Sequence, residues 1–241
     1  MTTERTYKAF IDFDGTITRR DLGEHLFYDF GDVERAKELV RRINEKTLVG
    51  TASWRALLDT LRDDATLDKL ATRAEDYEID PTFPAFVEFL RERGVEFFVL
   101  SDGFEFYISR VLEKAGITDA TIIANDLVER DGDLVPLFPH QDEECAECAN
   151  CKRNHIIENS ADEEFTIYVG NGVSDQCAAP YCDFIFAKDS LLNYCERERI
   201  TYFPYASFDD VRRRLEGLFA KKRLKKKHRA HMLRRQTYMR G

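Results

Sequence analysis

Two aspartates near the N-terminus have the type and spacing for phosphoryl chemistry. Residues 9–16 read Ala-Phe-Ile-Asp-Phe-Asp-Gly-Thr, so Asp12 and Asp14 follow an apolar run and precede a glycine. Residues two apart in a strand point to the same face, so both carboxylates are expected at one spot. Close carboxylates repel each other unless a cation or a shared proton relieves them. The pattern therefore predicts a Mg²⁺ site for a phosphorylated substrate, whereas the plain alternative is a strand followed by an acidic turn.

Further polar residues follow other apolar runs. Ser101 comes directly after Val99-Leu100, Asn171 and Asp175 come after Tyr168-Val169-Gly170, and Lys152 opens an expected helix. Open α/β sheets bind ligands at the carboxyl ends of their strands. Singly, Ser101 is typical of a helix N-cap and Lys152 of a surface lysine. Together and in this order they form the inventory that phosphoryl transfer needs.

Each of the reacting groups has a physical role. Asp12 would attack phosphorus as a nucleophile, which gives an aspartyl-phosphate. Asp14 would protonate the leaving oxygen and later take a proton from water. Lys152 would offset negative charge on Asp12 and on the phosphate. Asp12, Asp14 and Lys152 are therefore the predicted catalytic residues.

The remaining groups would hold substrate and metal. Ser101 and the amides near Asp102 and Gly103 are expected to bind phosphoryl oxygens, because a loop that opens a helix makes an anion site. Asn171 and Asp175 would complete the Mg²⁺ site begun by the two N-terminal aspartates.

The elements that position these residues read as an α/β domain. Apolar runs predict strands at 7–14, 95–100, 122–128, 134–138, 165–169 and 183–187. Helical periodicity predicts helices at 84–93, 104–115, 152–159, 189–199 and 207–220. Residues 130–133, Arg-Asp-Gly-Asp, signal a hairpin. Strands alternating with helices predict a doubly wound parallel sheet.

Residues 21–76 show helical periodicity and no strand pattern, so they read as an inserted helical cap. Ser53 and Thr66 are expected to start helices within it. The predicted organisation is an α/β core domain at 1–20 and 81–220, a cap domain at 21–80, and a basic C-terminal tail at 221–241.

The composition argues against a membrane-spanning or secreted protein. The chain of 241 residues is 43% hydrophobic, and no apolar run approaches the roughly 20 residues of a membrane span. The first residues lack the apolar core of a signal peptide, so a cytoplasmic location is expected, with the six cysteines reduced.

The net charge of -9 hides an asymmetry. Residues 221–241 carry ten Lys and Arg and no acid, whereas residues 1–220 carry 26 basic against 45 acidic residues. The tail could bind nucleic acid or anionic lipid, fold back on the acidic body, or extend the last helix into solvent. A role in binding nucleic acid is the less favoured of these, and membrane association is not expected.

Two other groups of residues have alternative interpretations. Cys145, Cys148 and Cys151 could bind zinc with a nearby histidine, although structural zinc sites usually combine two separated pairs. His25 could meet the substrate or simply lie on an amphipathic helix.

The motifs resemble those of the haloacid dehalogenase superfamily. The resemblance rests on residues 12–16, Ser101, Lys152 and residues 170–175, and the helical insertion resembles the first cap class of phosphoserine phosphatases. Residues 12–21, the loop 145–152 and residues 187–195 look most like the methionine-salvage 2-hydroxy-3-keto-5-methylthiopentenyl-1-phosphate phosphatases. The resemblance implies a Mg²⁺-dependent phosphatase that acts on a small phosphorylated metabolite. It adds Thr16 and Asp21 to the substrate-binding residues.

Two departures from the family pattern matter. Asn171 stands where the family usually has an aspartate that binds Mg²⁺, so weaker metal binding is expected, or a protein that binds a phosphorylated ligand without turnover. Asp21 stands where phosphoserine phosphatases usually carry Glu, so phosphoserine is the second choice of substrate.

Overall fold

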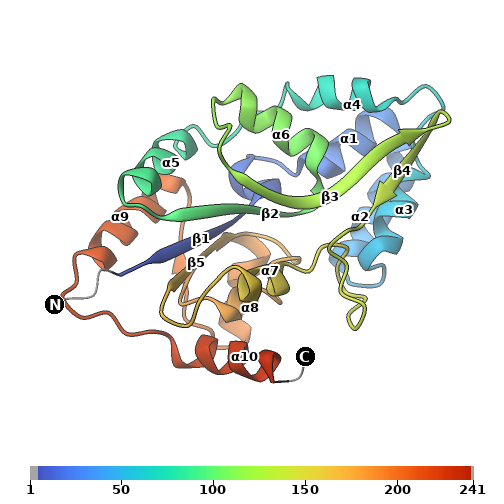
Figure 1. Cartoon of the computed structure of the whole chain (residues 1–241). Helices are drawn as coiled ribbons and strands as arrows, with labels where there is room; N and C mark the ends of the chain where they lie inside the picture. The colour runs from blue at the N-terminus through green and yellow to red at the C-terminus, as the bar shows by residue number, and fades with distance from the viewer. Residues whose placement is uncertain (1–4, 240–241) are drawn as a thin grey trace. The chain divides into compact units, whose positions relative to one another are not determined.

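The computed structural model describes residues 5–239 and contains a seven-stranded sheet flanked by helices (Figure 1). The strands are β1 (Tyr7–Asp12), β2 (Glu96–Phe104), β3 (Thr121–Arg130), β4 (Asp133–Leu137), β5 (Phe165–Gly170), β6 (Phe184–Ala187) and β7 (Phe203–Pro204). Their order is β4-β3-β2-β1-β5-β6-β7. β1 pairs with β5, β5 with β6 and β6 with β7 in parallel, and β3 pairs with β4 as the predicted antiparallel hairpin. The predicted α/β class is confirmed.

The chain forms two compact units. The first consists of Met1–Asp12, Asp80–Val99 and Lys152–Gly241, and the second of Phe13–Ile79 and Leu100–Cys151. Strand β2 contributes residues to both. The predicted cap residues fall in the second unit together with residues 100–151, and the predicted domain boundaries stay a prediction.

The first unit surrounds its strands with helices on both faces. Figure 1 shows α5 (Phe83–Glu92) and α9 (Phe208–Phe219) on one side of β1 and β5, and α7 (Lys152–Glu158), α8 (Asp189–Arg197) and α10 (His228–Tyr238) on the other. Every residue of β5 and β6 is buried, which fits their mostly apolar sequences, with Thr166 and Tyr168 as the hydroxyl-bearing members of β5. Ile11 pairs with Val169, so Asp12 comes level with Gly170. The parallel register thus places the end of β1 beside the loop that begins at Asn171.

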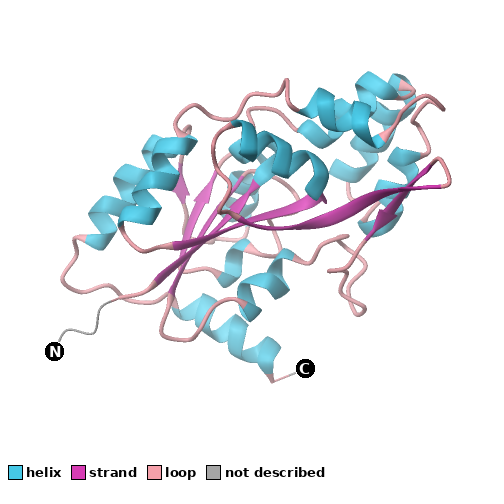
Figure 2. Cartoon of the chain, turned by 45° about the horizontal axis from the view of Figure 1, so that its top comes forward, coloured by secondary structure: helices cyan, strands magenta, loops and turns pink. Residues whose placement is uncertain are grey.

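Aromatic rings join the two helices on the first of these faces. The rings of Phe83 and Phe208 lie 4.7 Å apart, and those of Phe89 and Phe219 lie 6.0 Å apart. Figure 2 shows α5 and α9 packed side by side. The many phenylalanines of the chain therefore serve helix packing here.

The second unit holds the helices of the insertion: α1 (Leu22–Phe30), α2 (Val33–Asn44), α3 (Gly50–Leu58) and α4 (Leu67–Ala74). Helix α6 (Glu105–Lys114) packs on β3 in the same unit. The two ends of the insertion pair with each other through the bridge between Thr18 and Ile79. The predicted all-helical character of residues 21–76 is confirmed.

One predicted helix start is correct and one is wrong. The Thr66 hydroxyl accepts a hydrogen bond from the Lys69 amide and caps α4, as predicted. Ser53 lies inside α3 and donates to the Gly50 carbonyl. Helix α3 begins instead at Gly50, whose φ of +62° suits glycine, and a Cβ there would lie 2.4 Å from the Ala146 carbonyl oxygen.

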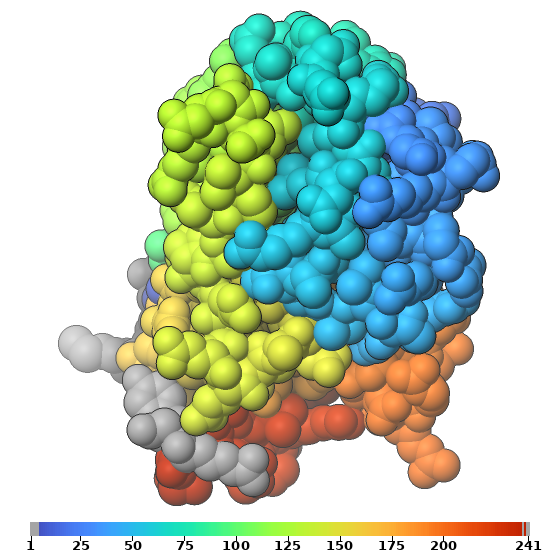
Figure 3. Space-filling view, turned by 90° about the vertical axis from the view of Figure 1, so that its right-hand side faces the viewer, coloured from blue at the N-terminus to red at the C-terminus, as the bar shows by residue number. Residues whose placement is uncertain are grey.

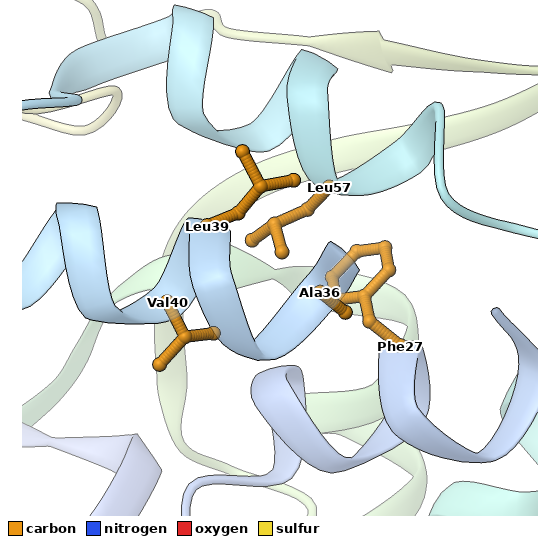
Figure 4. Close-up of a cluster of buried hydrophobic side chains, with 5 residues drawn as sticks. All are labelled: Phe27, Ala36, Leu39, Val40 and Leu57. Carbon is orange, nitrogen blue, oxygen red and sulfur yellow. The ribbon is translucent and has the colours of Figure 1, made fainter. Parts of the chain in front are cut away.

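The insertion has a hydrophobic cluster of its own. Figure 4 shows its buried side chains, which come from α1, α2 and α3: Phe27, Ala36, Leu39, Val40 and Leu57. In Figure 3 the blue and cyan helices of the insertion lie beside the yellow segment that follows β4. Arg55 of α3 stacks over the Phe138 ring at 5.3 Å, which joins the two segments.

Among the described residues, no helix is long and apolar enough to cross a membrane.

We expect Leu57→Ala to lower the free energy of unfolding by about 2–5 kcal/mol, because only 3% of Leu57 is exposed and its removal leaves a cavity. Urea unfolding followed by circular dichroism measures this. Val33→Ala, at a side chain that is 36% exposed, is the matched control and should change little. A loss below about 1 kcal/mol for Leu57→Ala would contradict the packing described for the cluster.

Candidate active site

A buried lysine lies between two carboxylates in the first unit. Lys152 is the first residue of α7, and its side chain is only 1% exposed. Its Nζ lies 2.5 Å from Asp12 Oδ1, 2.8 Å from Asp175 Oδ1 and 3.2 Å from Ser174 Oγ. The ordinary interpretation of Lys152 as a surface lysine is therefore wrong.

The charge state of Lys152 follows from its two partners. Burial on its own lowers the pKa of Lys152, but the negative charges of Asp12 and Asp175 and the hydrogen bonds to them raise it above the usual range. The side chain is thus an ammonium ion at all physiological pH values. It holds Asp12, which is 4% exposed at the end of β1, in one orientation.

Asp175 organises the loop that follows β5. Its Oδ1 accepts hydrogen bonds from Lys152 and from the Tyr168 hydroxyl at 2.6 Å, and its Oδ2 accepts from the amides of Asn171 and Gly172, both at 2.9 Å. A carboxylate has about four acceptor positions, so those of Asp175 are filled. Burial and the nearby Asp175 charge raise the pKa of Tyr168 well above its usual value, so Tyr168 remains a donor.

Glycine is required beside this carboxylate. A Cβ on Gly170 would lie 2.4 Å from Asp175 Oδ2, so any larger residue would displace the carboxylate. The Gly-Asn-Gly sequence of the loop therefore allows Asp175 to turn back onto its backbone.

In the second unit, the Asp14 side chain lies against the N-terminal end of helix α1. Its Oδ1 accepts from the amides of Leu22 at 2.9 Å and Gly23 at 3.2 Å, and its Oδ2 accepts from the Tyr107 hydroxyl at 2.9 Å and the Ser101 hydroxyl at 3.4 Å. Helix N-terminal amides are a favourable place for a carboxylate.

The electrostatic surroundings of Asp14 oppose its ionisation. Burial of the carboxyl group and the negative charge of Asp21 raise the pKa of Asp14 to about 7, although hydrogen bonds from Tyr107 and the α1 amides favour the charged form. A carboxyl group with this pKa can give and take a proton near neutral pH.

Ser101 and Gly103 lie in the last part of strand β2, close to Asp14. The Ser101 side chain is buried and accepts from the Gly103 amide at 2.9 Å. A Cβ on Gly103 would lie 1.6 Å from the Tyr107 hydroxyl oxygen. The Gly103 amide thus binds Ser101 in this structure, and the N-cap of α6 is Phe104 rather than Ser101.

Asp102 anchors the cysteine-bearing loop of the second unit. Its Oδ1 accepts from the amides of Ala149 at 3.0 Å and Asn150 at 2.7 Å, and Trp54 Nε1 lies 3.4 Å from its Oδ2. Asn150 is fully buried and donates to the carbonyls of Ser101 and Ile123. This places the Asp102 side chain in a structural network.

Two other predicted substrate residues lie in the second unit. Thr16 is 1% exposed. Asp21 is the N-cap of α1 and accepts from the Glu24 amide at 2.8 Å. Its negative charge also acts on Asp14, as described above.

The second unit has a polar cavity of about 500 Å³, and none of the predicted catalytic, substrate-binding or metal-binding residues lines it. It is lined by residues that include His25, Arg19, Arg20 and Tyr77. His25 therefore faces a cavity of mixed charge, and its ring lies 5.6 Å from that of Tyr28.

The cysteine loop shows no arrangement typical of zinc. Cys148 and Cys151 are buried, Cys151 Sγ lies 3.8 Å from an Asp142 carboxylate oxygen, and the six cysteines are free of disulfide bonds. Within residues 5–239, no group of three or more His, Cys, Asp and Glu side chains lies where it could hold a metal ion.

A family model described as haloacid dehalogenase-like hydrolase matches residues 9–180. The chain belongs to this family. It is 31% identical over 214 residues to a 2-hydroxy-3-keto-5-methylthiopentenyl-1-phosphate phosphatase of Bacillus mycoides (strain KBAB4), with 88% of this chain and 96% of the relative covered. The protein of the same name from Bacillus cereus (strain B4264) is 29% identical over the same shares of the two chains.

Solved structures show the same fold. A phosphoserine phosphatase with a phospho-aspartyl intermediate analogue superposes with a TM-score of 0.66 at 19% identity, covering 88% of this chain and 99% of its own. The haloacid dehalogenase-like family and the phosphatases among the relatives make this chain a phosphomonoester hydrolase.

Three residues were missed in the sequence. Tyr107 donates to the half-buried Asp14, Tyr168 donates to the buried Asp175, and Asn150 joins the loop to two strands. Tyr168 could have been found from the sequence, because a tyrosine in a fully buried strand needs a partner for its hydroxyl. Tyr107 lies on α6 at an apolar position of the helical pattern and is indistinguishable there from a core residue.

We expect Asp14→Asn to stabilise the metal-free protein above neutral pH. The folded state raises the pKa of Asp14 from 3.8 to about 7, so this residue's contribution to stability is complete below pH 3.8 and is lost as pH rises through 7. The shift corresponds to roughly 4 kcal/mol above pH 7 as an upper figure. Asparagine lacks this cost.

Urea unfolding in chelator at pH 4, 5.5, 7 and 8 tests this. The difference between Asp14→Asn and wild type should grow with pH up to about 7 and then level off, whereas the exposed control Asp63→Asn should show no such trend. A difference that is constant across these pH values would show that Asp14 titrates normally.

Proposed function

We propose that this protein is a Mg²⁺-dependent phosphatase that hydrolyses a small phosphorylated metabolite through an aspartyl-phosphate on Asp12. The observation that carries the proposal is the Lys152 ammonium held between Asp12 and Asp175 in a buried setting. A lysine in this position orients the carboxylate and offsets the charge that gathers as a phosphate dianion approaches it. Membership in a family of hydrolases supports this reading.

The reaction has two steps on this chain. An oxygen of Asp12 attacks phosphorus as the bond from phosphorus to the leaving oxygen breaks, and Asp14 gives its proton to that oxygen. Water then attacks the phosphoryl group, Asp14 takes a proton from the water, and the bond to Asp12 breaks with release of phosphate. Only Phe13 separates the two aspartates, so their Cα atoms stay within roughly 7 Å. The pKa of about 7 suits Asp14 to both proton transfers.

The donors at hand suit a hard cation. Asp12, Asp14, Asn171 and Asp175 offer carboxylate and amide oxygens, which Mg²⁺ prefers. Because the acceptor positions of Asp175 are filled, we assign Asp175 to hold Lys152 and the loop, and Asp12, Asp14 and Asn171 to direct binding. When bound, Mg²⁺ would offset negative charge on the phosphoryl oxygens.

Ser101 is the proposed phosphate-binding hydroxyl, since it already donates toward Asp14 in the second unit. Thr16, Asp102 and Gly103 complete the proposed substrate-binding residues, with Asp102 acting through the loop that it anchors. Asp21 contributes the negative charge that acts on Asp14.

The favoured substrate is 2-hydroxy-3-keto-5-methylthiopentenyl-1-phosphate, the compound in the names of the curated relatives. Phosphoserine is the second candidate and has the support of a shared fold alone. Phosphoserine phosphatases usually carry Glu at the position of Asp21, and the Asp side chain is one methylene shorter. This difference also favours the enol phosphate over phosphoserine. A binding role without turnover is the third candidate, because Asn171 replaces an expected charge. We place the reaction in the cytoplasm.

We expect Mg²⁺-dependent phosphate release that Asp12→Asn abolishes, because an amide cannot form the aspartyl-phosphate. Phosphate release from p-nitrophenyl phosphate, the enol phosphate and phosphoserine, with Mg²⁺ or chelator, measures this. Asp59→Asn, the same change at an exposed helix end, is the control and should retain activity. Folded protein that releases phosphate from none of these compounds would overturn the proposal in favour of a binding role.

Asn171→Asp should lower the Mg²⁺ concentration at half-maximal activity by roughly tenfold, because it adds a negative charge beside the cation. A Mg²⁺ titration of activity compares the variant with wild type and with Asn193→Asp, an exposed change of equal charge in the same unit. If the Mg²⁺ titration curves of Asn171→Asp and wild type coincide, Asn171 is not a direct ligand.

A further inference from the structure

We propose that the C-terminal arm, residues 221–239, is a brace that positions the loop carrying Asp175, with Arg234 as its positioning residue. The Asp175 loop is residues 170–178. The inference deepens the proposed function, because this loop holds Lys152 and the proposed Mg²⁺ ligand Asn171. All the residues that it uses lie in the first unit.

Two basic side chains of the arm, those of Lys226 and Lys227, are bound to other parts of the first unit. Lys226 Nζ donates to the carbonyls of Asp162 and Glu164, and Lys227 Nζ donates to the Thr201 carbonyl at 2.7 Å. The Lys227 amide donates to Asp183 Oδ1 at 2.8 Å. The sequence left several arrangements of the tail open. Over the described residues, the tail folds back on the acidic body of the protein.

Arg234 is a buried contact between helix α10 and the residues Thr166 and Asp183. It is 4% exposed, and Ala230, one turn earlier, is fully buried. Arg234 Nη1 donates to the Thr166 hydroxyl at 3.0 Å, and Nη2 lies 3.8 Å from Asp183 Oδ2. The Asp183 carboxylate also accepts from the amide and hydroxyl of Thr166. These contacts are one hydrogen bond and one longer ion pair, and among the described residues Nε and Nη2 of Arg234 have no hydrogen-bond partner. Because a buried guanidinium needs a nearby opposite charge, the Asp183 carboxylate favours one docked position of α10.

The docked helix reaches the proposed active site through one short element. Helix α10 packs on the 3-10 turn η2 (Ala179–Tyr181), and α7, which begins with Lys152, packs on the same turn. The Asp175 carbonyl accepts from the amides of Ala178 and Ala179. The turn therefore joins the arm to both members of the Lys152–Asp175 ion pair.

This turn needs support from outside. It is only three residues long, and a 3-10 turn of that length has too few hydrogen bonds to persist by itself. The loop before it contains Gly170 and Gly172, which leave the backbone flexible when its contacts are lost. The arm supplies the packing that the sequence of the loop lacks.

Arg234→Met tests the brace, and Arg235→Met is the matched control, since Arg235 is the exposed neighbour on the same helix. Hydrogen exchange of the metal-free proteins is measured over residues 165–182. We expect exchange there to accelerate by about tenfold or more in Arg234→Met and to match wild type in Arg235→Met. Arg234→Lys should restore part of the protection, because it keeps the charge.

The enzymatic readouts separate positioning from general loss of fold. In Arg234→Met the Mg²⁺ concentration at half-maximal activity should rise by about threefold or more and kcat should fall, with KM for the substrate nearly unchanged, because Ser101 and its neighbours lie in the second unit. Deletion of residues 221–241 should give the same pattern if the shortened protein folds. Unchanged exchange over residues 165–182 in Arg234→Met or in the deletion would overturn the proposal. Exchange that accelerates as expected in a protein without phosphatase activity would overturn the proposed function and leave the brace.

Discussion

The buried ion pair of Lys152 with Asp12 and Asp175 is the interaction on which the rest of the site depends. Burying charges is costly unless partners and hydrogen bonds satisfy them, and here the three side chains are each 6% exposed or less. Two carboxylates face one ammonium ion, so the cluster keeps an excess negative charge. A divalent cation relieves such an excess better than any neutral ligand. The cluster thus holds the three side chains in fixed positions, and its excess negative charge favours binding of the proposed Mg²⁺.

The frame is built from elements far apart in the chain. The register of β1 on β5 brings Asp12 level with Gly170, and the absence of a side chain at Gly170 lets Asp175 turn back to the loop amides. Tyr168 points its hydroxyl at the same carboxylate from within β5. Each contact orients Asp175, which in turn orients Lys152. A small change in the backbone of this loop would therefore also move Asp12, the proposed nucleophile.

Much of this arrangement was predictable because parallel strands end at one edge and the polar residues follow those ends in order. Asp12 and Asp175 are of this kind, and Lys152 was expected to offset the charge of Asp12 from the start of a helix. The contact of Lys152 with Asp175 was not predicted. Side-chain partners of residues on a buried helix face were not predictable. The sequence pattern of α6 indicates that Tyr107 is a core residue, and only the structure shows that its hydroxyl donates to Asp14. Ser53 was misread because a serine before an apolar helical run signals an N-cap only when the backbone preceding it is not already helical. The docking of α10 was left open because Arg234 shows its burial only in three dimensions.

The two aspartates of one short motif have opposite surroundings, which suits each of them to its proposed role. Asp12 faces an ammonium ion, which favours its charged, nucleophilic form. Asp14 is enclosed beside the negative charge of Asp21, which favours its protonated form near neutral pH. Carboxylates placed in contrasting environments are how proteins assign an acid and a base or nucleophile at one pH. If the surroundings were exchanged, the same two residues would no longer suit the proposed roles, so the proposed chemistry depends on Lys152, Asp21 and Tyr107 as much as on the aspartates themselves.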